Sequence, residues 1–213
     1  MTEVKKIMDT KLFHTDDNEI AEAGEILRKG GLVAFPTETV YGLGASAFDS
    51  DAAKKIYAAK GRPSDNPLIV HICDKGQIKD IAEEIPESAK KVIDNFMPGP
   101  VTIILKKKSV VPDDVTAGLN TVAIRFPLHE TAQKLIKAAG VPIAAPSANL
   151  SGKPSPTKAK HVVKDMTGRI DAIIDGGECN VGVESTIVDF TGEKPVILRP
   201  GGVTYDDLKG IGL

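Results

Sequence analysis

Apolar residues recur at helical spacing in four segments of the chain. Ala89, Val92 and Phe96 follow one another at intervals of three and four residues, which places them on one face of a helix. In the first of the four segments, Asp17 is a candidate N-cap and Gly30 is a candidate stop. We therefore expect helices over residues 18–29, 89–96, 132–139 and 159–166, and a further one over 52–59.

Short apolar runs lie between these segments and are typical of buried strands. They cover residues 32–35, 68–72, 101–105, 122–126, 143–145, 172–175, 186–190 and 196–198. Alternating helices and strands indicate an α/β protein, and the stretch 172–199, which has no helix, suggests antiparallel pairing there. No linker or internal repeat divides the chain, so we expect one domain with a mixed parallel and antiparallel sheet and flanking helices.

The composition is typical of a globular protein, and the chain is nearly neutral. Of its 213 residues 41% are hydrophobic, and 27 basic residues stand against 29 acidic ones, for a net charge of -2. This balance argues against a protein that wraps nucleic acid by charge alone. Only five basic residues are arginines, and Arg62, Arg125 and Arg199 lie within two residues of a proline. A guanidinium binds phosphate or carboxylate in a fixed geometry, so these turns are candidate anion sites, although incidental placement explains them as well.

Cysteine usage and the N-terminal segment favour a cytoplasmic protein. Cys73 and Cys179 are far apart, with no CxxC pair and no histidine at metal-ligand spacing, so two free thiols are expected. The N-terminal segment lacks the apolar core of a signal peptide, and no window approaches the roughly 18 apolar residues of a membrane span. We expect no membrane contact.

The common nucleotide fingerprints do not fit this chain. The P-loop pattern is absent, as are the HExxH, GxSxG and kinase signatures. Residues 42–47 match the GxGxxA string of dinucleotide-binding turns. However, the preceding predicted strand ends too early, and the next helix begins too late, for a phosphate to meet a helix N-terminus.

Polar segments stand instead where predicted strands meet turns. Lys60 and Arg62 are two cations at positions i and i+2, which in an extended segment point the same way and suit a polyphosphate. Arg125 lies in an apolar strand, where a charge is costly unless it is paired. Further groups of hydroxyl, amide and basic side chains occur in residues 36–42, 147–157, 182–190 and 198–202. Solvated loops explain several of these segments when each is taken alone.

Together the segments indicate chemistry by alignment and charge neutralisation. They supply Lys, Arg, Ser, Thr and Asn without a cysteine nucleophile or a His/Asp pair. Phosphoryl and nucleotidyl transfer depend on this kind of site, because their transition states gain most from positioning and electrostatic stabilisation. His71, inside a predicted strand, is either a half-buried structural histidine or a ligand contact.

The chain resembles the YrdC family over about residues 18–203. The resemblance rests on seven segments in this order: PTETVYGLG, KGRPSDNPLIVHI, PGPVTIIL, VAIRFP, PSANLSGKPSPT, VESTIVDF and LRPGG. The KxR and SxN signatures of the family are intact as Lys60-Gly61-Arg62 and Ser147-Ala148-Asn149. Members of this family make L-threonylcarbamoyladenylate from ATP, L-threonine and bicarbonate, for the t6A modification of tRNA.

The resemblance implies a fold and a set of site residues. The fold would be a twisted mixed α/β sheet with a concave, positively charged face, in one domain over residues 1–213 without the additional C-terminal domain of longer synthases. ATP would bind Lys60, Arg62, Ser64, Thr121, Ser147, Asn149, Ser155 and Arg199. Threonine would bind Thr37, His71, Arg125, Ala145 and Ser185.

The resemblance also implies the chemistry and the partners. Lys60 and Arg62 would be the catalytic residues, because they neutralise the polyphosphate, and Mg²⁺ would be held through the ATP phosphates without a metal site of the protein. A threonylcarbamoyl transferase complex would receive the product. We expect Lys60→Ala and Arg62→Ala to abolish turnover while leaving thermal unfolding nearly unchanged.

Two other functions remain open at this stage. A carbamoyl-adenylate-forming enzyme, like the related domain of hydrogenase maturation proteins, would start from carbamoyl phosphate. A non-catalytic module would instead bind tRNA or double-stranded RNA on a cationic face, with an affinity that falls steeply with salt.

Overall fold

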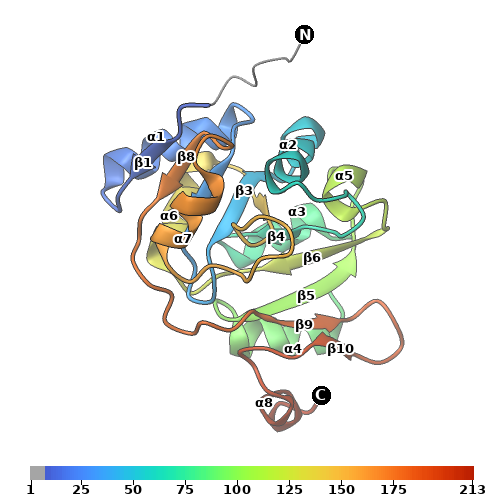
Figure 1. Ribbon diagram of the computed structural model, residues 1–213. Coiled ribbons are helices and arrows are strands. Elements are labelled where there is room, and N and C mark those ends of the chain that lie inside the picture. The colour runs from blue at the N-terminus through green and yellow to red at the C-terminus, as the bar shows by residue number, and fades with distance from the viewer. Residues whose placement is uncertain (1–7) are drawn as a thin grey trace.

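The computed structural model describes residues 8–213, so residues 1–7 of the expected domain lie outside the described part. These residues form one ten-stranded sheet (Figure 1). Its strands are β1 (Lys11–Phe13), β2 (Val33–Phe35), β3 (Gly42–Ser46), β4 (Ile69–His71), β5 (Val101–Lys106), β6 (Thr121–Arg125), β7 (Ile143–Ala145), β8 (Ala172–Ile174), β9 (Thr186–Asp189) and β10 (Val196–Arg199). Their order across the sheet is β1-β8-β2-β3-β7-β4-β6-β5-β9-β10.

The sheet is mixed, as the sequence predicts. The pairs β1–β8, β8–β2, β4–β6 and β5–β9 are parallel, whereas β2–β3, β3–β7, β7–β4, β6–β5 and β9–β10 are antiparallel. Antiparallel pairing near the C-terminal end is confirmed for β9 and β10 only. The expectation is wrong for β8, which pairs in parallel with β1 and β2 at the other end of the sheet. The loop that follows β8 carries the chain across the molecule before β9 begins.

The five helices expected from the hydrophobic pattern are present. They are α1 (Asp17–Arg28), α2 (Ser50–Lys60), α4 (Glu87–Phe96), α6 (Glu130–Ala139) and α7 (Ala159–Met166). Short helices were not predicted: η1 (Lys75–Gln77), α3 (Ile78–Ile81), α5 (Asp113–Thr116) and α8 (Tyr205–Gly210). The N-cap of α1 is Asp16 rather than Asp17, because the Asp16 carboxylate accepts the backbone N–H groups of Asn18 and Glu19, each at 3.1 Å.

The sheet separates two apolar cores, one on each of its faces. On one face α1 and α6 pack over the half that contains β8, β2 and β7, with Leu27, Phe35 and Leu135 among the residues between them. The opposite face packs against α2, α3, α4 and α7 through a larger core that includes Ile56, Val92 and Val162. On the first face, Ile104 and Ile187, in the half containing β4, β6, β5, β9 and β10, are only partly buried. This uncovered half is where a ligand can reach the sheet.

The segment 36–44, expected as a turn, includes the first three residues of the buried strand β3. Its residues, GLGAS, lack the β-branched and aromatic side chains that signal a strand. Pairing with β2 on one side and β7 on the other determines the strand conformation, so tertiary context overrides local propensity. Within residues 8–213, no helix has both the length and the apolar character needed to span a membrane.

Candidate functional site

A cavity of about 410 Å³ lies on the uncovered half of the sheet. This volume is within the roughly 300–1,000 Å³ typical of small-molecule sites. Eight of the thirteen residues predicted for the site line it: Thr37, Arg62, His71, Arg125, Ala145, Ser147, Ser185 and Arg199. Residues from both predicted groups, for ATP and for threonine, therefore meet in one cavity. Their individual roles stay predictions.

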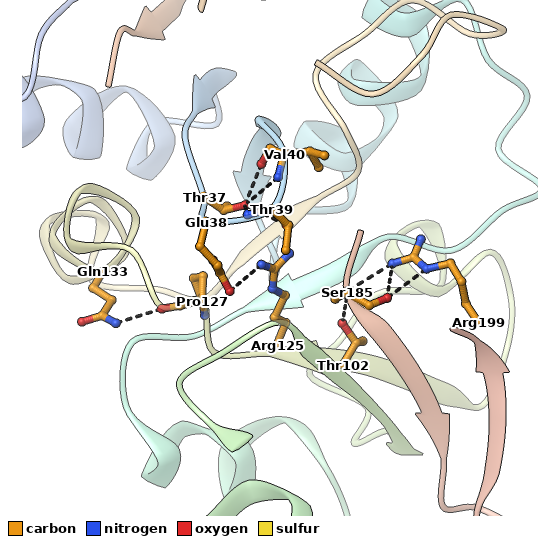
Figure 2. A network of polar contacts seen from close by, with 10 residues as sticks. All are labelled: Thr37, Glu38, Thr39, Val40, Thr102, Arg125, Pro127, Gln133, Ser185 and Arg199. Carbon is orange, nitrogen blue, oxygen red and sulfur yellow. Dashed lines mark hydrogen bonds and ion pairs between the residues drawn. The ribbon is translucent and has the colours of Figure 1, made fainter. Parts of the chain in front are cut away.

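Strand register brings three polar side chains of this site into one row. His71 of β4 pairs with Arg125 of β6, and Arg125 pairs in turn with Thr102 of β5. Paired residues of adjacent strands point to the same face, so the three side chains emerge together among the apolar residues of the uncovered half. The Thr102 hydroxyl lies 2.8 Å from the Ser185 hydroxyl, which connects the row to the segment that precedes β9 (Figure 2).

Arg125 is paired with a buried carboxylate, as its position in an apolar strand requires. Its Nη2 lies 2.8 Å from Oε1 of Glu38, and both side chains are about 95% buried. This contact is an ion pair without hydrogen-bond geometry: both Glu38 oxygens and the Nε and Nη2 of Arg125 form no hydrogen bond with the residues described here. Figure 2 shows Glu38 reaching Arg125 from the β2–β3 loop. Glu38 does not line the cavity, so it neutralises Arg125 from behind.

His71 is a neutral imidazole in the wall of the cavity. Its Nδ1 lies 3.0 Å from the carbonyl oxygen of Ile69, and its ring packs perpendicular to the ring of Phe35, with 5.9 Å between the centroids. Burial, together with the nearby Arg125 charge, lowers the pKa of His71 to about 3. A neutral ring that donates from Nδ1 leaves Nε2 as an acceptor, so His71 can accept a hydrogen bond from a ligand.

Thr37 is held in place by the turn that follows β2. Its hydroxyl donates to the carbonyl of Val40 at 2.6 Å and accepts the backbone N–H groups of Thr39 and Val40, each at 3.2 Å. This local hydrogen bonding fixes a side chain that the sequence places at a strand end. Ala145, at the end of β7, lines the cavity opposite Ile69 of β4.

The KxR and SxN signatures contact each other through Lys60. The Lys60 ammonium donates to the carbonyl oxygen of Ser147, to that of Asn149 at 2.8 Å and to Oδ1 of Asn149 at 3.5 Å. The side chain is buried behind the cavity wall and does not line it. Burial, and then the charge of Arg62, lowers the pKa of Lys60 to about 8. Gly61, at the end of α2, has a φ of 62°, which turns the chain so that Arg62 reaches the cavity.

The remaining predicted ATP residues are not among those that line the cavity. Asn149 is buried, and its amide donates to the carbonyls of Leu150 and Lys153. Ser64 is exposed in the loop after α2, and Thr121 begins β6. The Ser155 hydroxyl donates to Oε1 of Glu184 at 2.7 Å. The cavity itself carries Arg62, Arg125 and Arg199 together with the Glu184 carboxylate, and the expected positively charged concave face stays a prediction.

Three residues of this arrangement were not assigned from the sequence. Glu38 and Glu184 pair with arginines of the site, and Thr102 holds Ser185. The sequence offers a clue to the two acids, because each is adjacent to a predicted site residue: Glu38 follows Thr37, and Glu184 precedes Ser185. No comparable signal marks Thr102, whose role depends on strand pairing. Among residues 8–213, no group of three or more His, Cys, Asp or Glu side chains is arranged to hold a metal ion.

Known proteins share this sequence and this fold. The model of the Sua5/YciO/YrdC family, described as telomere recombination, matches residues 25–201. A threonylcarbamoyl-AMP synthase of Bacillus subtilis (strain 168) is 57% identical over 203 residues, covering 95% of this chain and 59% of the relative. A threonylcarbamoyl-AMP synthase of Pyrococcus abyssi (strain GE5 / Orsay) is 55% identical over 193 residues, covering 91% of this chain and 57% of the relative.

A solved structure of P. abyssi Sua5 complexed with L-threonine superposes with a TM-score of 0.94 at 52% identity. The superposition covers 95% of this chain and 61% of that one. The chain thus spans somewhat under two thirds of the length of these relatives. Because the family model covers most of the chain and the matching sequences are more than half identical to it, the chain belongs to the Sua5/YciO/YrdC family.

Proposed function

We propose that this protein is an L-threonylcarbamoyladenylate synthase that supplies the t6A modification of tRNA. The observation that carries the proposal is one cavity lined by Arg62, Arg125 and Arg199 together with neutral hydrogen-bonding groups and the Glu184 carboxylate. Separate arginines suit a ligand pair that carries separate anionic groups: the polyphosphate of ATP and the carboxylate of an amino acid. The threonylcarbamoyl-AMP synthase names of the relatives, and the L-threonine complex of P. abyssi Sua5, support this choice of substrates.

The amino acid would bind at the row of His71, Arg125 and Thr102. Arg125, neutralised from behind by Glu38, would take the carboxylate of threonine. The neutral His71 and the hydroxyls of Thr37 and Ser185 would recognise the amine or the side-chain hydroxyl. A site that hydrogen-bonds a substrate hydroxyl rejects analogues that lack it, by roughly 10⁴–10⁵-fold in favourable cases.

The reaction would proceed in two steps. The amine of threonine first attacks bicarbonate or the CO₂ derived from it, which forms the N–C bond of a carbamate. With bicarbonate, water is lost; with CO₂, the amine releases one proton to solvent. A carbamate oxygen then attacks the α-phosphorus of ATP, a new P–O bond forms, and pyrophosphate leaves as the bond to the β-phosphate bridging oxygen breaks. Arg62 and Arg199 would neutralise the polyphosphate, and Lys60 would hold the Ser147–Asn149 turn beside it.

Magnesium would enter with ATP, held mainly by phosphate oxygens. Mg²⁺ in such sites is bound by few protein groups together with substrate phosphates. The product would pass to a threonylcarbamoyl transferase complex, and a cytoplasmic location and contact with tRNA belong to the same proposal.

The test is pyrophosphate release by the purified chain. We expect release only when ATP, L-threonine and bicarbonate are all present, with the label of ¹³C-bicarbonate recovered in threonylcarbamoyl-AMP by mass spectrometry. Release that is indifferent to threonine or bicarbonate would contradict the proposal. Carbamoyl phosphate supporting release in place of both would favour a carbamoyl-adenylate enzyme. Arg62→Ala should abolish the reaction, whereas Arg169→Ala, at an exposed arginine outside the cavity lining, should retain it.

A further inference from the structure

Glu184 contacts two of the residues that are predicted to bind ATP. Its Oε1 accepts a hydrogen bond from the Ser155 hydroxyl at 2.7 Å, and its Oε2 pairs with Nη1 of Arg199 at 2.8 Å. Glu184 and Arg199 both line the cavity, and the Glu184 side chain is 41% exposed. One carboxylate therefore connects the loop that carries Ser155 to strand β10 at the cavity edge.

The rest of the Arg199 guanidinium is fixed by the backbone. Its Nε and Nη2 donate to the carbonyl oxygen of Ser185 at 3.0 and 2.8 Å, and Nη2 also donates to the Ser185 hydroxyl at 3.1 Å (Figure 2). Ser185 is held in turn by Thr102. Nη1 is thus the nitrogen of Arg199 whose partner is a charged, half-exposed side chain, while the other two keep protein partners when that side chain moves.

The Glu184 carboxylate occupies two donors, a guanidinium and a hydroxyl, that could bind another anion instead. Carboxylate and phosphate oxygens accept the same charge-assisted hydrogen bonds from a guanidinium, with similar geometry. Glu184 also brings a negative charge into a cavity that already contains Arg62 and Arg125. A polyphosphate that entered this cavity would be repelled by Glu184 and attracted by the donors that Glu184 occupies.

We propose that Glu184 is a positioning residue of the nucleotide site: its carboxylate holds Ser155 and Arg199 in place without nucleotide and is replaced at these donors by a phosphate of ATP. This inference rests on the proposed function, since it takes ATP as the ligand. Glu184 keeps the site ordered and lowers its affinity for nucleotide, because each binding event must displace an anion.

The variant Glu184→Gln tests this inference by calorimetric titration. Glutamine keeps the shape and a hydrogen-bond acceptor but removes the charge, so we expect the Kd for ATP to fall by about three- to tenfold in EDTA and with Mg²⁺. The Kd for adenosine, which has no phosphate, should stay unchanged. The KM for ATP should fall together with the Kd for ATP. The matched control is Glu178→Gln, since Glu178 is an exposed acid of the same loop that pairs with Lys158 at 3.0 Å and does not line the cavity. Its affinities should equal those of the unmodified protein.

Three results would overturn the inference. An unchanged or weaker affinity for ATP in EDTA would show that Glu184 does not compete with phosphate. Equal tightening for adenosine would point to a general effect on the cavity. Weaker binding that appears only with Mg²⁺ would make Glu184 a cation ligand instead.

If the unmodified chain releases pyrophosphate as proposed and Glu184→Gln does not bind ATP more tightly, the inference alone fails. A chain that binds ATP without forming the adenylate refutes only the proposed function.

Discussion

Glu38 and Arg125 form an ion pair that is almost completely buried, with 2.8 Å between Oε1 and Nη2. A buried pair of this kind is strongly coupled, because removal of one partner leaves the other charge without compensation. We expect Glu38→Gln and Arg125→Met each to lower the free energy of unfolding by about 3–5 kcal/mol.

The double variant distinguishes coupling from a general loss of packing. Glu38→Gln/Arg125→Met should be much more stable than the sum of the two single effects predicts, while threonine-dependent turnover stays lost. Urea denaturation of the four proteins measures the coupling. Strictly additive losses would show that the two charges do not depend on each other.

Lys60 and Arg62, two residues apart, should differ in their effect on stability. Lys60→Met removes the donor of the Ser147 and Asn149 carbonyls, which should cost about 1–3 kcal/mol. The Arg62 side chain makes no hydrogen bond with the described residues, so Arg62→Ala should change stability by no more than about 0.5 kcal/mol. This revises the sequence-based expectation that neither residue matters for unfolding. Thermal unfolding, with pyrophosphate release abolished in both variants, checks the difference; equal melting temperatures would contradict it.

The buried His71 should make stability depend on pH. Its pKa is lowered to about 3 in the folded protein, whereas an unfolded histidine titrates near 6.5. Between these values the unfolded state binds more protons, so stability decreases as pH falls, by about 2 kcal/mol from pH 7 to pH 5. Urea denaturation at the two pH values should show this loss in the unmodified protein. His71→Asn should show a loss smaller by that amount, since all other titrating groups are shared. Identical pH dependence would mean that His71 has the same pKa in the folded protein as in the unfolded chain.

Gly201 allows β10 to approach the segment that carries Ser185. A Cβ atom at this position would lie 2.2 Å from the carbonyl oxygen of Glu184 and 2.5 Å from the backbone nitrogen of Thr186. Gly201→Ala should therefore displace the backbone around Ser185, destabilise the protein by about 2 kcal/mol or more and weaken ATP binding. At Gly192 the nearest atom to such a Cβ is 3.8 Å away, so Gly192→Ala is the matched control and should behave like the unmodified protein in denaturation and titration. Unchanged ATP affinity in Gly201→Ala would show that the close approach at Gly201 does not influence nucleotide binding.

The sequence predicts the long elements well because their signals are local. Periodic apolar residues identify α4 and α6 to within two residues at each end, and apolar runs identify β5 and β6. The strand β3 escapes prediction because its glycines and small residues carry no strand signal. The N-cap of α1 differs by one residue, since Asp16 and Asp17 are chemically alike and only the geometry distinguishes them.

The site is predictable where a motif carries it and hidden where only tertiary structure does. Eight motif residues reach the cavity wall, and Lys60 and Asn149 meet behind it. The demand that Arg125 be paired follows from its apolar strand, but the identity of Glu38 as its partner follows only from how the β2–β3 loop lies over β6. Glu184 is also hidden, because an acid next to a serine in a loop has no unique meaning until Arg199 is seen beside it.

The row of His71, Arg125 and Thr102 has a consequence for how the chain becomes active during synthesis. Side chains alternate between the two faces of a strand, so a shift of one residue in β4, β6 or β5 would send one member of the row to the helix-covered side. Ser185 joins the row only after β9 has paired with β5, which lies more than 80 residues earlier in the chain. A nascent chain is therefore unable to form the complete row until β9 (Thr186–Asp189) has been translated. Ligand binding at this cavity would then report that the pairing of β9 with β5 is complete.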